Sequence, residues 1–334
     1  MKLLRWALFP FGFIYYLVVK MRNLAYDLGI FRSKECQMTT IAVGNLSTGG
    51  TGKSPMVEFL VSHFKSKHKV ATLSRGYGRK SKGFYEVSPT MHAAQVGDEP
   101  LQFKRKFTDI PVVVSESRNE GITKLKEYYP ELDLIILDDA YQHRKVKAAI
   151  YLLLTKYDEL YIDDFVLPVG NLREPRAGAK RADGIVVTKC PEHISQAERT
   201  NIIKKLKPKT HQRVFFSSIK YSQTIVNDQE KIPLKLLHNT TFSLVTGIAN
   251  PKPLVQFLTK SAYDFDHLRF SDHHNFTEKE LQKLDTLTCI VTTEKDYIRL
   301  QPNLNKVQLY YLPITITIIE EENFTAFIKK KLAI

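Results

Sequence analysis

The sequence has few cysteines, and this limits the kinds of site that it can build. Its three cysteines are Cys36, Cys190 and Cys289, which are far apart and odd in number. Their spacing fits neither a disulfide framework nor a zinc site. We therefore expect a reducing compartment, and we assign these thiols to packing rather than to chemistry.

The sequence also lacks an apolar run long enough to span a bilayer. Apolar residues extend from Ala7 to Val19, interrupted by Pro10 and Gly12, whereas a span needs about 20 residues. No small-x-small cleavage site directly follows, as it would in a signal peptide. Aromatic residues and basic flanks favour a membrane-surface helix over residues 1–22. The alternatives are a helix buried on the protein's own core and a true transmembrane or signal segment.

Acidic residues are outnumbered. Lys plus Arg total 49 against 35 Asp plus Glu, a net charge of +14, while 43% hydrophobic residues are typical of a globular protein. The excess predicts an acidic partner: nucleic acid, an anionic membrane surface or a phosphorylated substrate. No nucleic-acid-binding motif is recognisable, and aromatic residues are not interleaved with the basic loops. We therefore expect no nucleic-acid partner.

Short apolar runs alternate with helical or irregular stretches along most of the chain. The runs lie at 40–43, 69–74, 110–115, 132–139, 150–155, 184–189 and 213–219. This alternation predicts an α/β fold with a mostly parallel sheet and helices on both faces. We assign residues 23–222 to this domain and 223–240 to a linker. Residues 241–334 are expected to form a smaller C-terminal α/β domain.

The segment "STGGTGKS" at 47–54 follows the first apolar run and precedes a helical pattern. Gly52, Lys53 and Ser54 match the end of a P-loop, although Ser47 replaces its first glycine. Glycines let backbone N–H groups turn around an anion, and the helix start adds partial positive charge. The expected nucleotide-binding residues are Gly49, Gly50, Thr51, Gly52, Lys53 and Ser54. The alternative is an ordinary glycine-rich turn.

Two adjacent carboxylates, Asp138 and Asp139, end the run "LIILDD". Neighbouring carboxylates repel unless a cation lies nearby. Their position after a buried strand is that of a Walker B motif, which holds Mg²⁺ directly or through water. With the Ser54 hydroxyl they are the predicted metal ligands, and the sequence does not decide which aspartate is nearer the ion. The alternative is a solvated acidic turn.

Several polar loops could also carry chemistry. Asp98 in "GDEP" could take a proton from an attacking hydroxyl, and "SDHHNF" offers His273 or His274 as its partner. Basic loops such as "SRGYGRK" and "GNLREPR" could stabilise phosphoryl charge. The substrate-binding or charge-stabilising candidates are Arg75, Glu99, Arg118, Gln142, Arg173 and Glu174. Lysines after a strand in "VTKC" and "TTEKD" could read a base, but neither motif is specific.

Taken together, these motifs resemble the tetraacyldisaccharide 4'-kinase family, the lipid A 4'-kinases of Gram-negative bacteria. The resemblance spans most of the chain and depends on "GNLSTGGTGKSP", "SRGYGRK", "GDEP", "DDAYQH", "GNLREP", "DHHNF" and "TEKD", in that order. It implies ATP and Mg²⁺, with the 4'-hydroxyl of a tetraacylated glucosamine disaccharide 1-phosphate as acceptor. It also implies a peripheral or monotopic enzyme on the cytoplasmic face of the bacterial inner membrane, held by its N-terminal helix.

The same resemblance implies roles for individual residues. Asp98 becomes the candidate base, with His273 rather than His274 as its partner, and Lys53 keeps its catalytic P-loop role. The family usually has glycine after the two aspartates, where this chain has Ala140. If the backbone there required a positive φ, alanine would be strained.

The sequence therefore predicts an ATP-dependent lipid kinase. The alternative is a membrane-associated P-loop switch ATPase. Such ATPases carry a second lysine early in the glycine loop, and Thr48 stands at that position here. Acceptor dependence separates the two, because a kinase consumes ATP in step with lipid phosphorylation whereas a switch ATPase responds to a protein partner.

Overall fold

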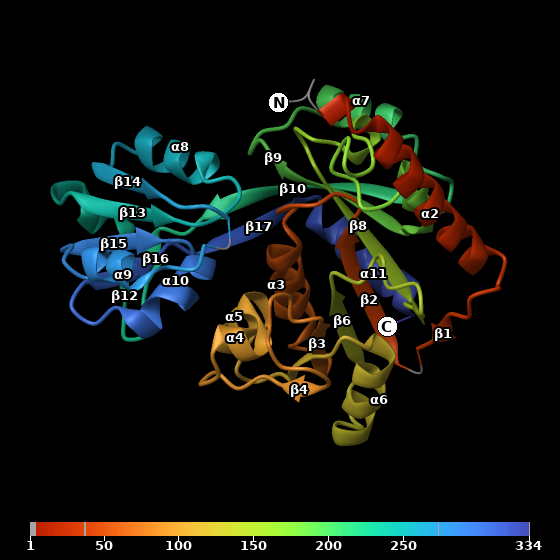
Figure 1. Cartoon of the computed structure of the whole chain (residues 1–334), viewed down its shortest axis with the longest axis horizontal. Helices are drawn as coiled ribbons and strands as arrows, with labels where there is room; N and C mark the ends of the chain where they lie inside the picture. The colour runs from red at the N-terminus through yellow and green to blue at the C-terminus, as the bar shows by residue number, and fades with distance from the viewer. Residues whose placement is uncertain (1–4, 37, 273, 334) are drawn as a thin grey trace.

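A nine-stranded sheet forms the centre of the molecule (Figure 1). The computed structural model describes residues 5–36, 38–272 and 274–333. The strand order is β17-β10-β9-β8-β2-β6-β3-β5-β4. The strands are β2 (Thr39–Asn45), β3 (Val70–Ser74), β4 (Tyr85–Glu86), β5 (Val112–Val114), β6 (Leu134–Asp138), β8 (Ile150–Lys156), β9 (Gly184–Cys190), β10 (Arg213–Tyr221) and β17 (Ile314–Ile319). Only the edge strands β4 and β17 pair antiparallel, so each predicted apolar run forms a strand of a mostly parallel sheet.

Helices cover both faces of this sheet, because successive side chains of its central strands point to opposite faces. Ile41 and Val43 of β2 pack into the cluster that contains α3, α5 and α11, whereas Ala42 packs with α6. The helices are α3 (Lys53–Phe64), α4 (Ala93–Val96), α5 (Asp98–Lys106), α6 (Arg118–Tyr128), α7 (Gln196–Leu206) and α11 (Glu321–Leu332). The predicted α/β, P-loop NTPase-like fold is confirmed.

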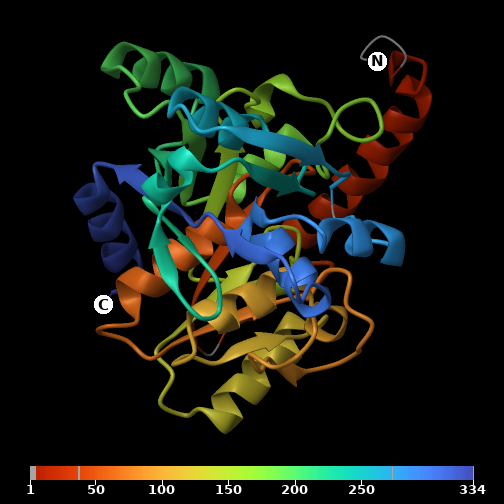
Figure 2. The same ribbon diagram turned by 90° about the vertical axis from the view of Figure 1, so that its left-hand side faces the viewer.

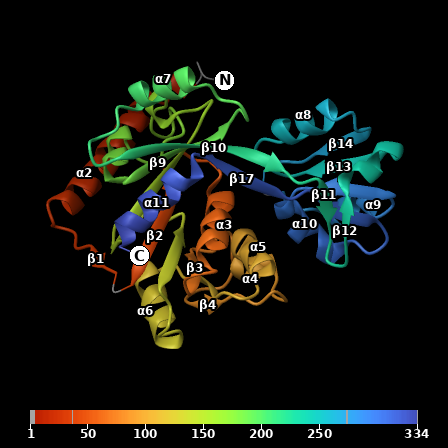
Figure 3. The ribbon, with the colours of Figure 1, turned by 180° about the vertical axis from the view of Figure 1, so that it is seen from behind.

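A six-stranded sheet lies to one side of the large one (Figures 1 and 3). Its order is β12-β11-β16-β15-β13-β14. The elements are β11 (Thr224–Val226), β12 (Lys231–Pro233), β13 (Phe242–Thr246), α8 (Lys252–Lys260), β14 (Phe265–Arg269), α9 (Glu278–Leu284), β15 (Cys289–Thr292), α10 (Glu294–Leu300) and β16 (Gln308–Tyr311). Strands β13 to β16 run parallel, as expected for a second α/β unit.

The boundaries of this second unit differ from those expected. Strand β17 pairs with β10 along six residue pairs, and Phe324, Ile328 and Leu332 of α11 are buried in the core under α3. Residues 314–332 therefore pack with the large sheet, not with the C-terminal unit in which the sequence placed them. The expected linker at 223–240 contains β11 and β12, which are strands of the smaller sheet.

Short elements complete the chain. The two-residue strands β1 (Lys34–Glu35) and β7 (Val146–Lys147) pair parallel. The 3-10 helices are η1 (Tyr161–Asp163), η2 (Arg176–Arg181), η3 (Leu234–Asn239) and η4 (Gln301–Asn303).

Helix α2 (Phe9–Asp27) lies along the edge of the molecule, coloured red in Figure 2. Pro10 falls in its first turn, where no N–H partner is needed, so the residue that interrupts the apolar run permits the helix start. The helix extends to residue 27, beyond the expected limit at 22. Gly12 and Val19 are buried against the protein, while most of the large apolar side chains of α2 are exposed.

Candidate active site

The P-loop connects β2 to α3 and has the backbone of an anion cradle. Gly49 and Gly52 have φ values of +93° and +87°, which favour glycine. Gly52 precedes α3 without a side-chain cap, so the first N–H groups of the helix are not taken by a capping side chain. These groups and the partial positive charge of the helix start can receive phosphate oxygens.

Lys53 begins α3 and lies within a charged cluster. Its Nζ is 3.7 Å from Asp139 Oδ1 and 3.4 Å from Asn45 Oδ1. Arg173 donates two hydrogen bonds to Asp139, of 2.8 and 3.0 Å, and one of its Nη2 hydrogens also reaches Asn45 Oδ1. Burial favours protonation of Asp139, but the hydrogen bond from Arg173 and the charge of Lys53 hold its pKa lower, at about 2. Asp139 is therefore an ionised partner for both cations.

Asp138, at the end of β6, is fully buried beside this cluster. Its Oδ1 has no hydrogen-bond partner among the described residues. Burial, followed by the carboxylates of Glu99 and Asp139, raises its pKa to about 7. A divalent cation would satisfy the unpaired Oδ1 of Asp138 and offset the repulsion from the two neighbouring carboxylates. The residues present therefore fit Mg²⁺.

The Ser54 hydroxyl donates a hydrogen bond of 2.7 Å to Glu99 Oε1. Lys295 of α10 donates to the same oxygen at 2.5 Å. Burial raises the pKa of Glu99, but the charge and hydrogen bond of Lys295, together with Lys53 and the Ser54 hydroxyl, keep this pKa below its usual value. The "GDEP" and "TTEKD" motifs thus meet beside the P-loop, and Lys295 is engaged by a carboxylate.

Asp98 is the first residue of α5 and lies next to this group in the chain. Arg299 of α10 donates to its Oδ2 from Nε at 2.9 Å and from Nη2. The proposed partner His273 lies outside the described residues. The neighbouring His274 contacts Glu280 Oε2 of α9 at 3.0 Å and Ser271 Oγ of its own loop at 3.3 Å.

Two of the candidates, Gln142 and Glu174, form a polar network under α2. Gln142 donates to the Asn45 carbonyl at 2.7 Å and to Glu174 at 3.0 Å. Arg181 and Asn23 also donate to Glu174, at 2.8 and 3.0 Å. Glu174 is thus held by groups from three parts of the chain and links α2 to the strand end at Asn45.

Two of the candidate arginines, Arg118 and Arg75, act on His143 in the loop after β6. Arg118 is buried and donates to the Ser115 and Asp138 carbonyls. Arg75 is exposed on the loop after β3. Burial, followed by the charges of Arg118 and Arg75, lowers the pKa of His143 to about 4. The charges of these two arginines favour an anionic ligand nearby.

The loop after Asp138 shows where the backbone is constrained. The positive φ belongs to Asp139, at 45°, and not to Ala140. Alanine at position 140 therefore causes no left-handed strain. A Cβ on Gly44 would lie 2.6 Å from Tyr141 Cβ, so the glycine in "VGNLS" allows this loop to pack against β2.

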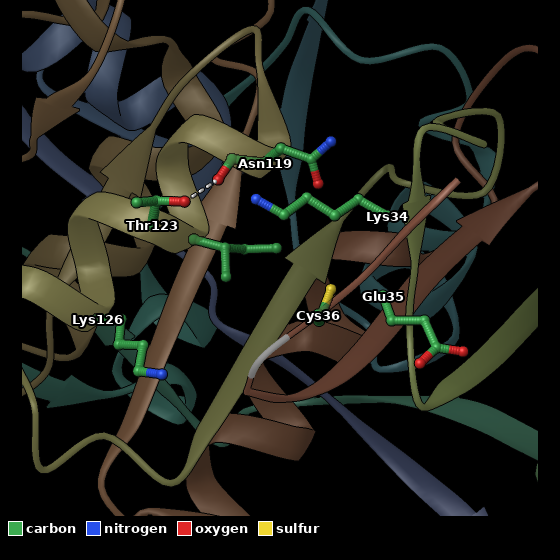
Figure 4. Close-up of a pocket in the computed structure, with 7 residues that line it drawn as sticks. Lys34, Glu35, Cys36, Asn119, Thr123 and Lys126 are labelled. Atoms are coloured by element: carbon green, nitrogen blue, oxygen red, sulfur yellow. Dashed lines mark hydrogen bonds between the residues drawn. The ribbon is translucent and has the colours of Figure 1, made fainter. Parts of the chain in front are cut away.

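Two hollows in the described part of the chain differ greatly in size. A cavity of 350 Å³ lies between α2 and the 164–177 loop, with Phe13, Phe165 and Val169 in its lining. A hollow of 20 Å³ lies between β1 and α6, beside Cys36, where Thr123 Oγ1 donates to the Asn119 carbonyl at 2.9 Å (Figure 4). The second has room for about one water molecule and cannot hold a nucleotide.

Comparison with known proteins decides the family. The family model described as tetraacyldisaccharide-1-P 4'-kinase matches residues 4–333. The chain belongs to this kinase family. A tetraacyldisaccharide 4'-kinase of Flavobacterium johnsoniae is 47% identical over 97% of this chain and 96% of its own. That of Bacteroides thetaiotaomicron is 39% identical over 96% and 90%.

A solved structure of the kinase family agrees with the fold. The crystal structure of LpxK from Aquifex aeolicus in complex with ATP matches with a TM-score of 0.80 and 29% sequence identity. It covers 98% of this chain and 99% of the other. The predicted family is therefore confirmed, and the match extends over both sheets.

Some residues of this kinase site were not predicted from the sequence. Asn45 has no predicted role, although a buried asparagine as the last residue of the P-loop strand is a recognisable signal. Lys295 was considered for reading a base, and the structure places it on Glu99 instead. Arg299 carried no sequence signal. The roles of the predicted residues stay predictions.

Proposed function

We propose that this chain transfers the γ-phosphoryl group of ATP to the 4'-hydroxyl of a tetraacylated glucosamine disaccharide 1-phosphate. The observation that carries the proposal is the meeting of Ser54 and Glu99 in a member of this kinase family. It brings the "GDEP" motif, with its candidate base, to the P-loop, where the γ-phosphate is expected. A switch ATPase does not require such a base.

The P-loop and its neighbours are proposed to bind the phosphates of ATP. The start of α3 supplies N–H groups that can donate to phosphate oxygens. The ammonium of Lys53 is expected to contact the β- and γ-phosphates. Arg173 and Lys53 share Asp139, so one carboxylate orients both cations at the proposed phosphate site. Preorganised charge of this kind stabilises a transition state without reorganisation at the moment of reaction.

Asp138 and the Ser54 hydroxyl are the residues proposed to hold Mg²⁺, with Asp139 and Glu99 nearby. Bound Mg²⁺ supplies positive charge to the phosphate oxygens. Within the described residues no cluster of three or more His, Cys, Asp or Glu is suited to a metal. A magnesium ion needs fewer protein ligands, because it keeps several waters and also binds substrate phosphates.

Asp98 is proposed to accept the proton of the 4'-hydroxyl, with His273 as its partner. The hydroxyl oxygen forms a bond to the γ-phosphorus, the bond from that phosphorus to the β–γ bridging oxygen breaks, and ADP leaves. A carboxylate within reach of the hydroxyl is an adequate base for such a transfer.

Helix α2 is proposed to place the site at an anionic membrane surface, on the cytoplasmic face of the inner membrane. Its inner face contacts the site directly, since Tyr15 donates to the Arg173 carbonyl at 2.7 Å and Arg22 to that of Gln142 at 2.9 Å. Its outer face is apolar and exposed. None of the helices in the described part of the chain has the length and apolar composition to cross a bilayer. An interfacial helix suits a lipid substrate, and the 350 Å³ cavity beneath it could admit part of an acyl chain.

Acceptor dependence tests the proposal. The purified chain is incubated with ATP and Mg²⁺ in detergent micelles, with and without the tetraacyldisaccharide 1-phosphate, and ADP release is followed. We expect ADP to form in step with the added lipid and only slowly without it. ADP formation that ignores the lipid but responds to a protein partner would support the switch ATPase instead.

A further inference from the structure

Helix α10 of the smaller sheet contacts the start of α5, and two ion pairs join the helices. Lys295 pairs with Glu99, and Arg299 pairs with Asp98. The second pair links residues 201 positions apart in the chain. It joins the candidate base to an arginine that belongs to the smaller sheet.

The geometry of the Arg299–Asp98 pair orients the carboxylate. Nε and Nη2 of the guanidinium both donate to Oδ2 of Asp98. Two donors fixed in one plane restrict the rotation of a carboxylate more than a single ammonium can.

Arg299 is itself held in place by the smaller sheet. Its Nη1 donates to Asp296 Oδ1 at 3.3 Å. Asp296 is 0% exposed, and its Oδ2 accepts hydrogen bonds from the Gly247 N–H at 2.9 Å and the Thr293 hydroxyl at 2.7 Å. Gly247 directly follows β13. A chain of contacts thus extends from β13 through Asp296 and Arg299 to Asp98.

We propose that Arg299 is a positioning residue that holds Asp98 in its reactive orientation and makes this orientation depend on the docking of α10. The inference rests on the proposed function, in which Asp98 accepts the proton of the acceptor hydroxyl. It adds a role for the smaller sheet: that sheet carries the group that aligns the base. Movement of α10 away from α5 would release Asp98 and lower the rate of transfer.

The test compares Arg299→Ala, Arg299→Lys and a matched control, Arg269→Ala. Arg269 is an exposed arginine on β14 of the same sheet. Phosphoryl transfer to the lipid, direct ATP binding and thermal unfolding are measured for each. A general base contributes about 10²–10⁴-fold to a rate, so we expect a misaligned one to lower kcat roughly 10- to 100-fold. ATP affinity should change less than about twofold, because Arg299 contacts the base and not the P-loop.

Two further readouts separate positioning from a merely structural role. Added guanidinium should restore part of the lost kcat in Arg299→Ala. Arg299→Lys should keep an intermediate rate, since lysine retains the positive charge but not the two coplanar N–H donors of the guanidinium. In an Asp98→Asn background, Arg299→Ala should cause little further loss, because the two residues act as a unit.

Each contrary outcome has a defined meaning. An unchanged kcat in Arg299→Ala, with an active wild type, contradicts the inference alone. So does a loss that multiplies with that of Asp98→Asn, or a loss confined to ATP affinity. A wild-type chain that transfers no phosphate to the lipid contradicts the proposed function, and the positioning role fails with it.

Discussion

The ammonium of Lys53 lies 3.7 Å from Oδ1 of Asp139. Arg173 donates one hydrogen bond to each carboxylate oxygen of the same aspartate. One aspartate thus holds two cations at the start of α3. Since β2 and β6 are neighbours in the sheet, the P-loop and the acidic pair reach the same edge. This arrangement keeps positive charge beside the expected position of the phosphates.

Lys53→Ala and Ser54→Ala test this arrangement. The first removes the charge that follows the γ-phosphate, and the second removes a proposed Mg²⁺ ligand. Loss of one such electrostatic partner typically costs about 10²–10³ in rate. Steady-state transfer to the lipid measures the effect, with the exposed Lys67→Ala as the matched control. Near-normal turnover in both folded variants would contradict the P-loop assignment.

The outer face of α2 can be tested without removing the helix. Phe11, Ile14 and Val18 lie on that face and are 64%, 59% and 60% exposed. Replacing all three with glutamine should weaken binding to anionic vesicles, because apolar burial in the headgroup region is lost. The melting temperature should change little, since these side chains are already in water.

The buried Val19→Ala variant on the same helix provides the matched comparison. It should lower the melting temperature and leave vesicle binding nearly intact. Vesicle pelleting and a melting curve are measured on both proteins. The reverse pattern, with vesicle binding unchanged in the triple variant and its stability lowered, would indicate that the outer face packs on the protein.

Asp98 and His273 are expected to act as a pair. Asp98→Ala should lower kcat strongly with little effect on ATP affinity, and His273→Ala should do so less severely. The double variant should be scarcely slower than Asp98→Ala alone, because residues that act as a unit are not additive. Rate losses that multiply in the double variant would show independent roles. Weaker ATP binding with kcat preserved would make Asp98 a nucleotide or Mg²⁺ contact.

The interface between α5 and α10 contains a buried carboxylate with a pH-dependent effect on stability. Burial, followed by the nearby charge of Glu58, raises the pKa of Glu294 to about 7 despite the ammonium of Lys106 at 3.8 Å. A raised carboxyl pKa means that the folded state binds the proton more tightly than the unfolded state. The resulting stabilisation is complete below the unfolded pKa, about 4.3, and is lost as pH rises through 7.

Glu294→Gln removes this titration and keeps a neutral side chain of similar size. Relative to wild type, the variant should gain unfolding free energy between pH 5 and pH 8, by about 1–3 kcal/mol. Denaturant unfolding at the two pH values measures the difference, with the exposed Glu278→Gln as the control. A difference that does not change with pH would mean that Glu294 is already ionised in the folded protein at pH 5.

Much of the fold could be predicted because its signals are local. Parallel strands buried on both faces appear as continuous apolar runs, and the motifs follow the ends of those runs, as "LIILDD" shows. The return of β17 and α11 to the large sheet could not be predicted, since an edge strand such as "ITITII" carries no mark of the sheet it will join. The end of α2 at Asp27 was not predicted, because the apolar run already ends at Val19.

The candidate site divides in the same way. Lys53, Ser54 and Asp138 belong to motifs in which each residue type has a chemical reason at its spacing. Arg299 belongs to no such motif. Its partner Asp98 is 201 positions away, and an arginine on a short polar helical segment is usually solvated. Contacts between two α/β units depend on how the units dock, and a single sequence does not carry that information.

The most direct measurement is to identify the phosphorylated product. The wild-type chain is incubated with γ-labelled ATP, Mg²⁺ and tetraacyldisaccharide 1-phosphate in micelles, and the lipid is isolated and analysed by mass spectrometry and NMR. We predict one additional labelled phosphate at the 4' position, and almost none with Lys53→Ala or without Mg²⁺. Label that appears only as inorganic phosphate, with the lipid unchanged, would contradict the proposed kinase activity.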